Sequence, residues 1–240
     1  MRAELIDYMG SDLTVVNAAR VSFNKESEWE PEFYIPDEFT RDLIAMGKQL
    51  SEKDQKLISY LAKHNHWTPF SHVMITMRET VPIFIARQRF KHMVGFTYNE
   101  ESRRYVSDDP TFFIPDVWRK AAENKKQGSS DEVITHVMDY DIEEYTIPIG
   151  DAYHEFLGQA ANLYDTLLDA GVAPEQARMV LPQSMFTSYY VTGSLAAWGR
   201  AYKLRSDPHA QLEIQQLAKQ WDDIISNIPE MKYSWQALTS

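Results

Sequence analysis

Residues 87–105 read R-Q-R-F-K-H-M-V-G-F-T-Y-N-E-E-S-R-R-Y, a basic segment in an acidic chain. This segment contains five Lys or Arg residues and only two acidic residues, Glu100 and Glu101, so its formal charge is +3. The whole chain carries a formal charge of −11, which leaves −14 for the remainder. A locally basic segment in an acidic protein is typical of an anion-binding site. Polar neighbours such as Gln88 and His92 can hydrogen-bond a polar ligand. The basic segment therefore predicts a site for a phosphate-bearing small molecule such as a nucleotide.

The flanks of the basic segment predict how it is placed. Residues 72–81 alternate between apolar and polar side chains, which predicts a half-buried strand. Pro82 suits the first turn of a helix, which we expect to run to Gly95. On that helix the apolar stripe includes Phe90 and Met93, and the basic segment begins as the neighbouring polar face.

The rest of the chain predicts one α+β domain. Four longer helices are expected: one at 51–65 capped by Ser51, one at 152–170, one that begins after Ser194, and one capped by Asp207 with Pro208 in first position. Short helices are expected near 38–47 and 116–124, and a strand at 184–192. Together they predict a mixed or antiparallel sheet flanked by long helices, over residues 1–240. Acidic or variable excursions occupy residues 24–50 and 119–150.

Composition limits the classes of function. With 240 residues, 44% hydrophobic and 25% charged, the chain is typical of a globular protein with a sizeable core. A pI near 5.1 argues against bulk binding to nucleic acid or to an anionic membrane. The sequence has no apolar run of membrane-spanning length, and M-R-A-E-L-I-D lacks the layout of a signal peptide. We therefore expect a cytoplasmic protein.

The lack of cysteine and of glycine-rich loops in the sequence excludes several kinds of site. The chain has no cysteine, so it has no disulfide, thiolate metal ligand or cysteine nucleophile. Its nine glycines form neither of the standard glycine-rich phosphate loops. A metal cluster of His64, His66 and His72 is an alternative, but no acidic residue lies between them. A loop whose His and Thr side chains line a pocket is the favoured interpretation, with no metal.

Six segments in order resemble the flavin-dependent thymidylate synthases. They span residues 17 to 216 and leave the two excursions outside. The segments are N-A-A-R-V-S-F (17–23), L-I-S-Y-L-A-K-H-N-H-W-T-P-F-S-H (57–72), P-I-F-I-A-R-Q-R-F-K-H (82–92), Y-N-E-E-S-R-R-Y (98–105), A-R-M-V-L-P (177–182) and L-R-S-D-P-H-A-Q-L-E-I-Q-Q (204–216).

The resemblance implies an activity that needs no cysteine. The family transfers a one-carbon unit from methylenetetrahydrofolate to dUMP and reduces it with hydride from FAD, which NADPH recharges. It also implies a homotetramer whose active sites are built from several subunits. Two alternatives stay open: a non-catalytic nucleotide-binding protein, and a related dUMP-modifying enzyme with an altered product. A metal-dependent hydrolase is the least favoured.

The resemblance also implies roles for individual residues. Arg205 and Ser102 are the implied catalytic residues, with Arg205 stabilising negative charge on the ionised uracil; without the resemblance, Arg205 reads as a cation at a helix end. The implied dUMP contacts are Gln88, Lys91, Glu100, Glu101, Ser102, Arg103, Arg104, Arg178 and Arg205, with Arg104 and Arg178 clamping the phosphate. The implied FAD contacts are Ser22, Thr68, Lys91, His92, Met93, Glu100, Ser194 and Arg200. His66, Ser71 and His209 are expected to line the flavin pocket.

The basic segment departs from the family pattern, which is R-H-R, seven residues, then Ser. Here the sequence is Lys91-His92-Met93, eight residues, then Ser102. Lys keeps the charge of Arg but loses its planar fork, and Met loses both. Arg89 precedes Met93 by one predicted helical turn, and we hypothesise that it replaces the lost guanidinium.

Overall fold

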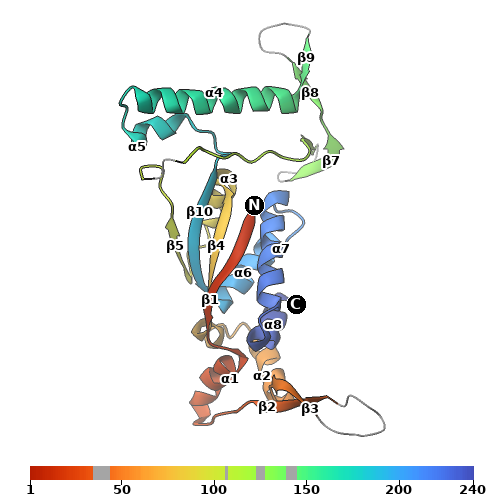
Figure 1. Cartoon of the computed structure of the whole chain (residues 1–240). Helices are drawn as coiled ribbons and strands as arrows, with labels where there is room; N and C mark the ends of the chain where they lie inside the picture. Colours follow the sequence, from red (N-terminus) through yellow and green to blue (C-terminus); the bar gives the residue numbers. More distant parts are fainter. Residues whose placement is uncertain (35–43, 106–107, 123–127, 139–144) are drawn as a thin grey trace.

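The computed structural model describes residues 1–34, 44–105, 108–122, 128–138 and 145–240. Its largest sheet over these ranges is antiparallel, with the order β1-β4-β10-β5 (Figure 1). The strands are β1 (Arg2–Met9), β4 (Met74–Pro82), β10 (Phe186–Ser194) and β5 (Phe96–Glu100). Val191 of β10 pairs with Met77 on one side and with Tyr98 on the other, so segments far apart in the sequence meet in the centre of the sheet.

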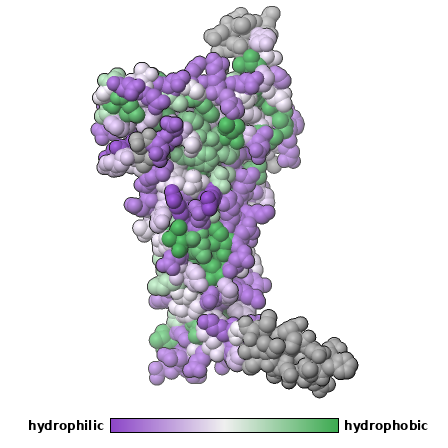
Figure 2. All heavy atoms as spheres, viewed as in Figure 1, coloured by the Kyte–Doolittle hydropathy of each residue, from purple (hydrophilic) through white to green (hydrophobic). Residues whose placement is uncertain are grey.

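The two faces of the sheet follow the alternation of the sequence. In β4, Ile75, Met77 and Glu79 are fully buried on the inner face, whereas the side chain of Arg78 is exposed on the outer one. This confirms the strand predicted at 72–81. Figure 2 shows an apolar area near the middle of the molecule. Strand β1, at the edge of the sheet, has exposed apolar side chains such as Met9.

Helices cover the inner face. They are α3 (Ile83–Arg89), α6 (Leu195–Arg205), α7 (Leu212–Ser226) and α8 (Lys232–Thr239), the last preceded by the 3-10 turn η4 (Pro229–Met231). Trp198 of α6 and Trp221 of α7 are fully buried, with ring centroids 5.5 Å apart. The Ser194 hydroxyl accepts from the Ala197 N–H at 3.2 Å and caps α6, as predicted.

One end of the molecule holds α1 (Asp12–Arg20), α2 (Glu52–Lys63) and the hairpin β2 (Glu30–Tyr34)–β3 (Ile44–Gln49), with 3-10 turns η1 (Val21–Phe23) and η2 (Pro69–His72) (Figure 1). Ser51 caps α2 as predicted. Arg20 forms a salt bridge with Asp54 of α2. Of the helix predicted near 38–47, residues 44–47 are in β3, and 35–43 lie outside the described residues.

The other end holds α4 (Ile149–Asp169), α5 (Pro174–Ala177) and the 3-10 turn η3 (Arg178–Val180), with two hairpins, β6 (Arg119–Ala121)–β7 (Ser129–Val133) and β8 (His136–Met138)–β9 (Thr146–Pro148). The helix predicted at 152–170 is confirmed as α4. The helix predicted at 116–124 is wrong, because Arg119 pairs with Val133 in an antiparallel hairpin.

Two helix ends differ from the sequence prediction. The helix after Pro82 ends at Arg89, not Gly95, because Arg89 turns into the core and the chain reverses towards β5. Gly95 has φ +80°, and a Cβ there would lie 2.9 Å from the Cβ of Ala197, so the turn favours glycine. The last long helix begins at Leu212, since the Asp207 carboxylate accepts from the His209 N–H and does not cap α7.

Candidate functional site

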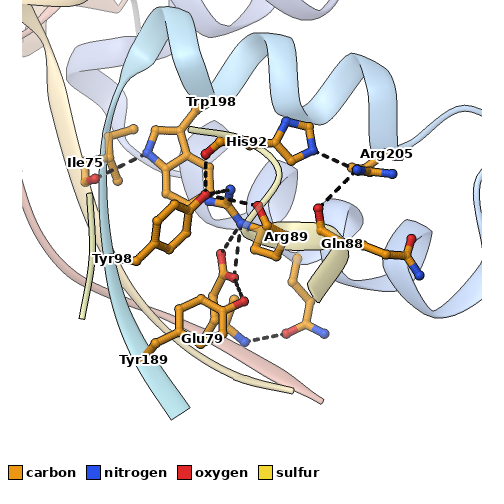
Figure 3. Close-up of polar contacts among 11 residues, drawn as sticks. Ile75, Glu79, Gln88, Arg89, His92, Tyr98, Tyr189, Trp198 and Arg205 are labelled. Carbon is orange, nitrogen blue, oxygen red and sulfur yellow. Dashed lines mark hydrogen bonds and ion pairs between the residues drawn. The ribbon is translucent and has the colours of Figure 1, made fainter. Parts of the chain in front are cut away.

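A buried cation lies below the turn that connects α3 to β5. Arg89 is fully buried, and its Nε lies 3.2 Å from a carboxylate oxygen of Glu79, which is equally buried (Figure 3). The carboxylate also accepts a hydrogen bond from the Tyr189 hydroxyl. Four aromatic rings surround the guanidinium carbon at 4.4 to 5.3 Å, those of Phe96, Tyr98, Trp198 and Trp221. The charge of Arg89 is therefore neutralised inside the protein.

Tyr98 connects this buried pair to the turn above it. Its hydroxyl accepts from Arg89 Nη1 at 2.6 Å and lies 2.7 Å from the His92 carbonyl oxygen, to which it donates. Burial raises the pKa of Tyr98 to about 12, an effect that Arg89 opposes and Glu79 reinforces. Tyr98 thus stays protonated and fixes the backbone of the turn from below.

Arg205, at the end of α6, lies above the same turn. Its Nε donates to His92 Nε2 at 2.8 Å, and its Nη2 donates to the Gln88 carbonyl oxygen at 3.1 Å (Figure 3). Burial, followed by the charges of Arg205, Arg89 and Arg200, lowers the pKa of His92 to about 4. His92 is therefore neutral near pH 7, with Nε2 free to accept.

A polar cavity of about 660 Å³ opens beside Arg205. Gln88, His209, Gln211 and Arg119 line it together with Arg205. Burial, followed by repulsion from Arg89, lowers the pKa of Arg205, but a guanidinium remains charged at physiological pH. Within the described parts of the chain, Arg205 forms no salt bridge with a carboxylate. Its positive charge is thus presented to the cavity.

A second cavity, of about 360 Å³, holds the other group of predicted substrate residues. Glu100, Glu101, Arg103 and Arg178 line it. The Glu100 carboxylate accepts from the Thr187 hydroxyl at 2.7 Å. Arg103 Nε is buried and has no hydrogen-bond partner within the described ranges. The guanidinium groups of Arg103 and Arg178 line this cavity together, and two such groups can bind one anionic ligand.

Comparisons with known proteins decide the family. The chain matches the family described as "Thymidylate synthase complementing protein" over residues 4–229. It is 36% identical over 231 residues to the flavin-dependent thymidylate synthase of Thermosipho africanus, covering 96% of this chain and 86% of the relative. The chain belongs to the flavin-dependent thymidylate synthases. Among other relatives, that of Thermus thermophilus is 33% identical, covering 97% of this chain and 73% of the relative.

A solved structure agrees with this family and with the α+β fold. The UMP/dUMP methylase PolB from Streptomyces cacaoi, bound with 5-Br dUMP, superposes with a TM-score of 0.73 at 28% identity. The match covers 99% of this chain and 94% of PolB. The chain is therefore an enzyme of the flavin-dependent thymidylate synthase family.

The altered motif residues of this family member lie on the turn after α3. The side chain of Lys91 is exposed, and Met93 is 74% exposed. The hypothesis that Arg89 replaces the lost guanidinium is wrong, since Arg89 is enclosed in the core with Glu79 and cannot reach a ligand. Arg104 is exposed over the ring of Tyr105, so Arg103, not Arg104, shares a cavity with Arg178.

The residues predicted to contact FAD or line its pocket fall at separate places in one chain. Ser22 lies in η1, and Thr68 is exposed at the start of η2. Arg200 Nη2 donates to the Val94 carbonyl oxygen at 2.9 Å, on the turn that carries Lys91, His92 and Met93. Ser194 is buried as the cap of α6, so its FAD role stays a prediction.

The three predicted pocket-lining residues are also apart. The ring centroid of His66 lies 6.0 Å from that of Tyr60, and the Ser71 hydroxyl donates to the Trp67 carbonyl oxygen at 3.4 Å. His209 lines the first cavity. In the described part of the chain, no cluster of His, Asp and Glu is arranged to hold a metal ion. Nor does any helix there combine the length and apolar character of a membrane span.

Sequence reasoning missed the supports of the site. The sequence does contain a signal for Glu79, because this residue occupies an inward-facing position of a strand that otherwise buries apolar side chains. A charged residue at such a position indicates a buried partner. Tyr98, Arg119 and Gln211 carried no such signal, since their contacts are made by residues from other elements.

Proposed function

We propose that residues 1–240 form one catalytic domain that transfers a one-carbon unit from methylenetetrahydrofolate to C5 of dUMP, giving dTMP. FAD is the redox cofactor and NADPH the reductant. The observation that carries the proposal is Arg205, a charged guanidinium without a carboxylate partner among the described residues, held by His92 and Gln88 at the wall of a 660 Å³ cavity.

Arg205 supports activation of the pyrimidine without a covalent nucleophile. A fixed guanidinium beside the ring N–H favours the deprotonated ring, and the additional electron density makes C5 a better nucleophile. The chain has no cysteine to attack the ring, so this route is consistent with its composition. Neutral His92 and the Gln88 carbonyl oxygen keep the guanidinium oriented.

The second cavity supports a phosphate site. Arg178 and Arg103 both line it, so two guanidinium groups are available to one anion. We assign Arg103 and Arg178 to the phosphate, with Ser102 beside them as the second catalytic residue. The remaining dUMP contacts are Gln88, Lys91, Glu100, Glu101 and Arg104.

Two cations near the turn after α3 support an FAD site there. Lys91 and Arg200 lie on and beside the turn after α3, and neither forms a salt bridge within the described ranges. Cations so placed suit a pyrophosphate. We assign FAD to Ser22, Thr68, Lys91, His92, Met93, Glu100, Ser194 and Arg200. When bound and reduced, FAD supplies hydride; the protein residues bind and orient it.

The separation of the two cavities supports a shared active site in a homotetramer. The cavity at Arg205 and the cavity at Arg178 have no lining residue in common. Mixing inactive Arg205→Met and Arg178→Met proteins, after dissociation and reassembly, should therefore restore activity to about a quarter of wild type, the share of sites with both arginines intact. Mixtures as inactive as their components would overturn the shared site.

Tritium release from C5-labelled dUMP tests the activity itself. Release that requires both methylenetetrahydrofolate and NADPH, from a yellow protein with flavin absorbance, is the expected result. A colourless protein that FAD cannot reconstitute would overturn the proposal. Binding of dUMP without tritium release or NADPH oxidation would indicate the non-catalytic alternative.

A second candidate is methylation of UMP as well as dUMP. PolB, named a UMP/dUMP methylase, has been solved with both 5-Br dUMP and 5-Br UMP. This chain also departs from the family motif at Lys91 and Met93. Mass analysis after incubation with each nucleotide separates the two. A product of UMP that is heavier by one methylene group supports the wider specificity, and a methylated product from dUMP alone excludes it.

A further inference from the structure

The hairpin β6–β7 contributes to the wall of the Arg205 cavity. Arg119, Gly128 and Ser129 line that cavity together with Gln88 and Arg205. This hairpin belongs to the 119–150 excursion, outside the six segments that carry the family resemblance. A wall of the nucleotide cavity is thus built by a part of the chain to which no family residue role was assigned.

Arg119 holds this wall in place. Its Nε donates to the Ser129 hydroxyl at 2.7 Å across the hairpin, and its Nη2 donates to Glu213 Oε1 at 2.7 Å at the start of α7. The side chains of Arg119 and Glu213 are 21% and 8% exposed, so the pair is largely withdrawn from water. Burial acts to raise the pKa of Glu213, but hydrogen bonds from Arg119 and Gln211 outweigh it and lower the pKa overall. Glu213 is therefore an ionised acceptor.

The amide of Gln211 connects that carboxylate to Gln88. An ionised carboxylate can only accept, so Gln211 donates its Nε2 to Glu213 Oε2, at 2.8 Å, and turns its carbonyl oxygen away. That oxygen accepts from Gln88 Nε2 at 2.6 Å. Gln88 Oε1 then has no partner among the described residues and is left for the cavity. The orientation of the Gln88 amide follows from the charge of Glu213, two hydrogen bonds away along the network.

We propose that Arg119 is a positioning residue for the nucleotide site, acting through Glu213 and Gln211 to fix which end of the Gln88 amide faces the ligand. The inference rests on the proposed function, because it takes the ligand of the cavity to be dUMP. Gln88 is the residue that touches the nucleotide, and Arg119 acts on it from the hairpin. Loss of Arg119 frees the hairpin wall and loosens the amide network, so it weakens nucleotide binding more than it slows the chemical step.

The test uses the FAD-loaded enzyme and measures KM and kcat for dUMP, with the dissociation constant of dUMP by calorimetry. Arg119→Met and the isosteric Glu213→Gln should each raise KM and the dissociation constant about tenfold, the value of one charge-assisted hydrogen bond, and leave kcat within about twofold. Arg119→Lys should recover part of the loss, because it keeps a cation for Glu213.

Lys120→Met is the matched control. Lys120 forms an ion pair with Glu132 on the same hairpin at 2.9 Å, and it does not line the Arg205 cavity. It should leave KM unchanged. Arg119→Met with a wild-type KM would overturn the inference, as would an equal rise in Lys120→Met. If Arg119→Met fails to fold, Glu213→Gln carries the same prediction. A wild-type enzyme that does not bind dUMP would overturn the proposed function and this inference together.

Discussion

Arg89 and Arg205 lie below and above the same turn, and they differ in how their charges are balanced. Arg89 is fully buried with Glu79, whereas Arg205 is half-buried and is held by the neutral acceptors His92 Nε2 and the Gln88 carbonyl oxygen. A carboxylate neutralises a guanidinium, while a neutral acceptor orients it without cancelling its charge. The first arrangement stabilises the core, and the second leaves a positive charge available to a ligand.

The two arginines are also coupled. The charge of Arg89 contributes to the lowered pKa values of both His92 and Arg205, after burial in each case. Tyr98 joins them physically, since its hydroxyl contacts Arg89 Nη1 and the His92 carbonyl oxygen. The core pair thereby sets the position of the turn on which the site depends.

Breaking the core pair should have the largest effect on stability. Arg89→Met leaves Glu79 buried without a cation, which should cost about 3–5 kcal/mol in the free energy of unfolding. Denaturant titration measures it. The double variant Arg89→Met/Glu79→Gln should recover part of the loss, because it no longer buries an unpaired carboxylate at position 79. An Arg89→Met protein as stable as wild type would show that the pair is not a structural unit.

Removing the ligand-facing cation should instead affect catalysis. Arg205→Met should lower the rate of tritium release from dUMP by about 10² to 10³, the usual loss for one preorganised electrostatic group. Its midpoint of thermal unfolding should stay close to that of wild type, since Arg205 has no carboxylate partner among the residues that the structure describes. Full activity in Arg205→Met would contradict the comparison.

The link between the two arginines should have an intermediate effect. Tyr98→Phe removes a hydroxyl that accepts from Arg89 and donates to the His92 carbonyl oxygen, at a cost of about 1–2 kcal/mol in stability. Tyr190→Phe is the control, because Tyr190 is 49% exposed on the outer face of the sheet. If both variants lose the same stability, the role of Tyr98 as a bridge is wrong.

The last effect concerns pH. The pKa of His92 in the folded state, about 4, lies below its ordinary value of 6.5. The unfolded chain therefore binds the proton more tightly, and the contribution of His92 to stability is present above pH 6.5 and lost as the pH falls towards 4. NMR titration of the ring should give the low pKa, and His92→Asn should flatten the fall in stability across that window. A ring that titrates near 6.5 would contradict the burial of a neutral His92.

The fold was predictable where one element decides its own structure. The alternation in β4, the Ser51 and Ser194 caps and the amphipathic α4 all follow from neighbouring residues. The end of α3 was not, because Arg89 stops the helix by turning towards Glu79 on one strand and Tyr98 on another. Arg119 was misplaced in a helix for the same reason, since its strand exists only when paired with β7.

The basic segment was predictable as a binding site from its residues, but the roles of Gln88, His92 and Arg205 came only from the resemblance. The structure brings these three residues together, whereas the sequence suggested Arg89 for the ligand and gave Arg119 no role. Whether a guanidinium is paired with a carboxylate depends on residues distant in sequence. A helical pattern alone does not distinguish a core arginine from a ligand-binding one.

The central claim is that Arg205 presents an uncompensated charge to the pyrimidine. Ultraviolet titration of bound 5-bromo-dUMP measures this directly, because ionisation of the ring N–H changes its absorbance. The account predicts that the ring pKa is lower when the nucleotide is bound to the wild-type enzyme than when it is free, and that Arg205→Gln abolishes the difference. Two results would contradict it: a ring pKa that is the same in the bound and the free nucleotide, or a bound ring pKa that is lowered as much in Arg205→Gln as in the wild-type enzyme.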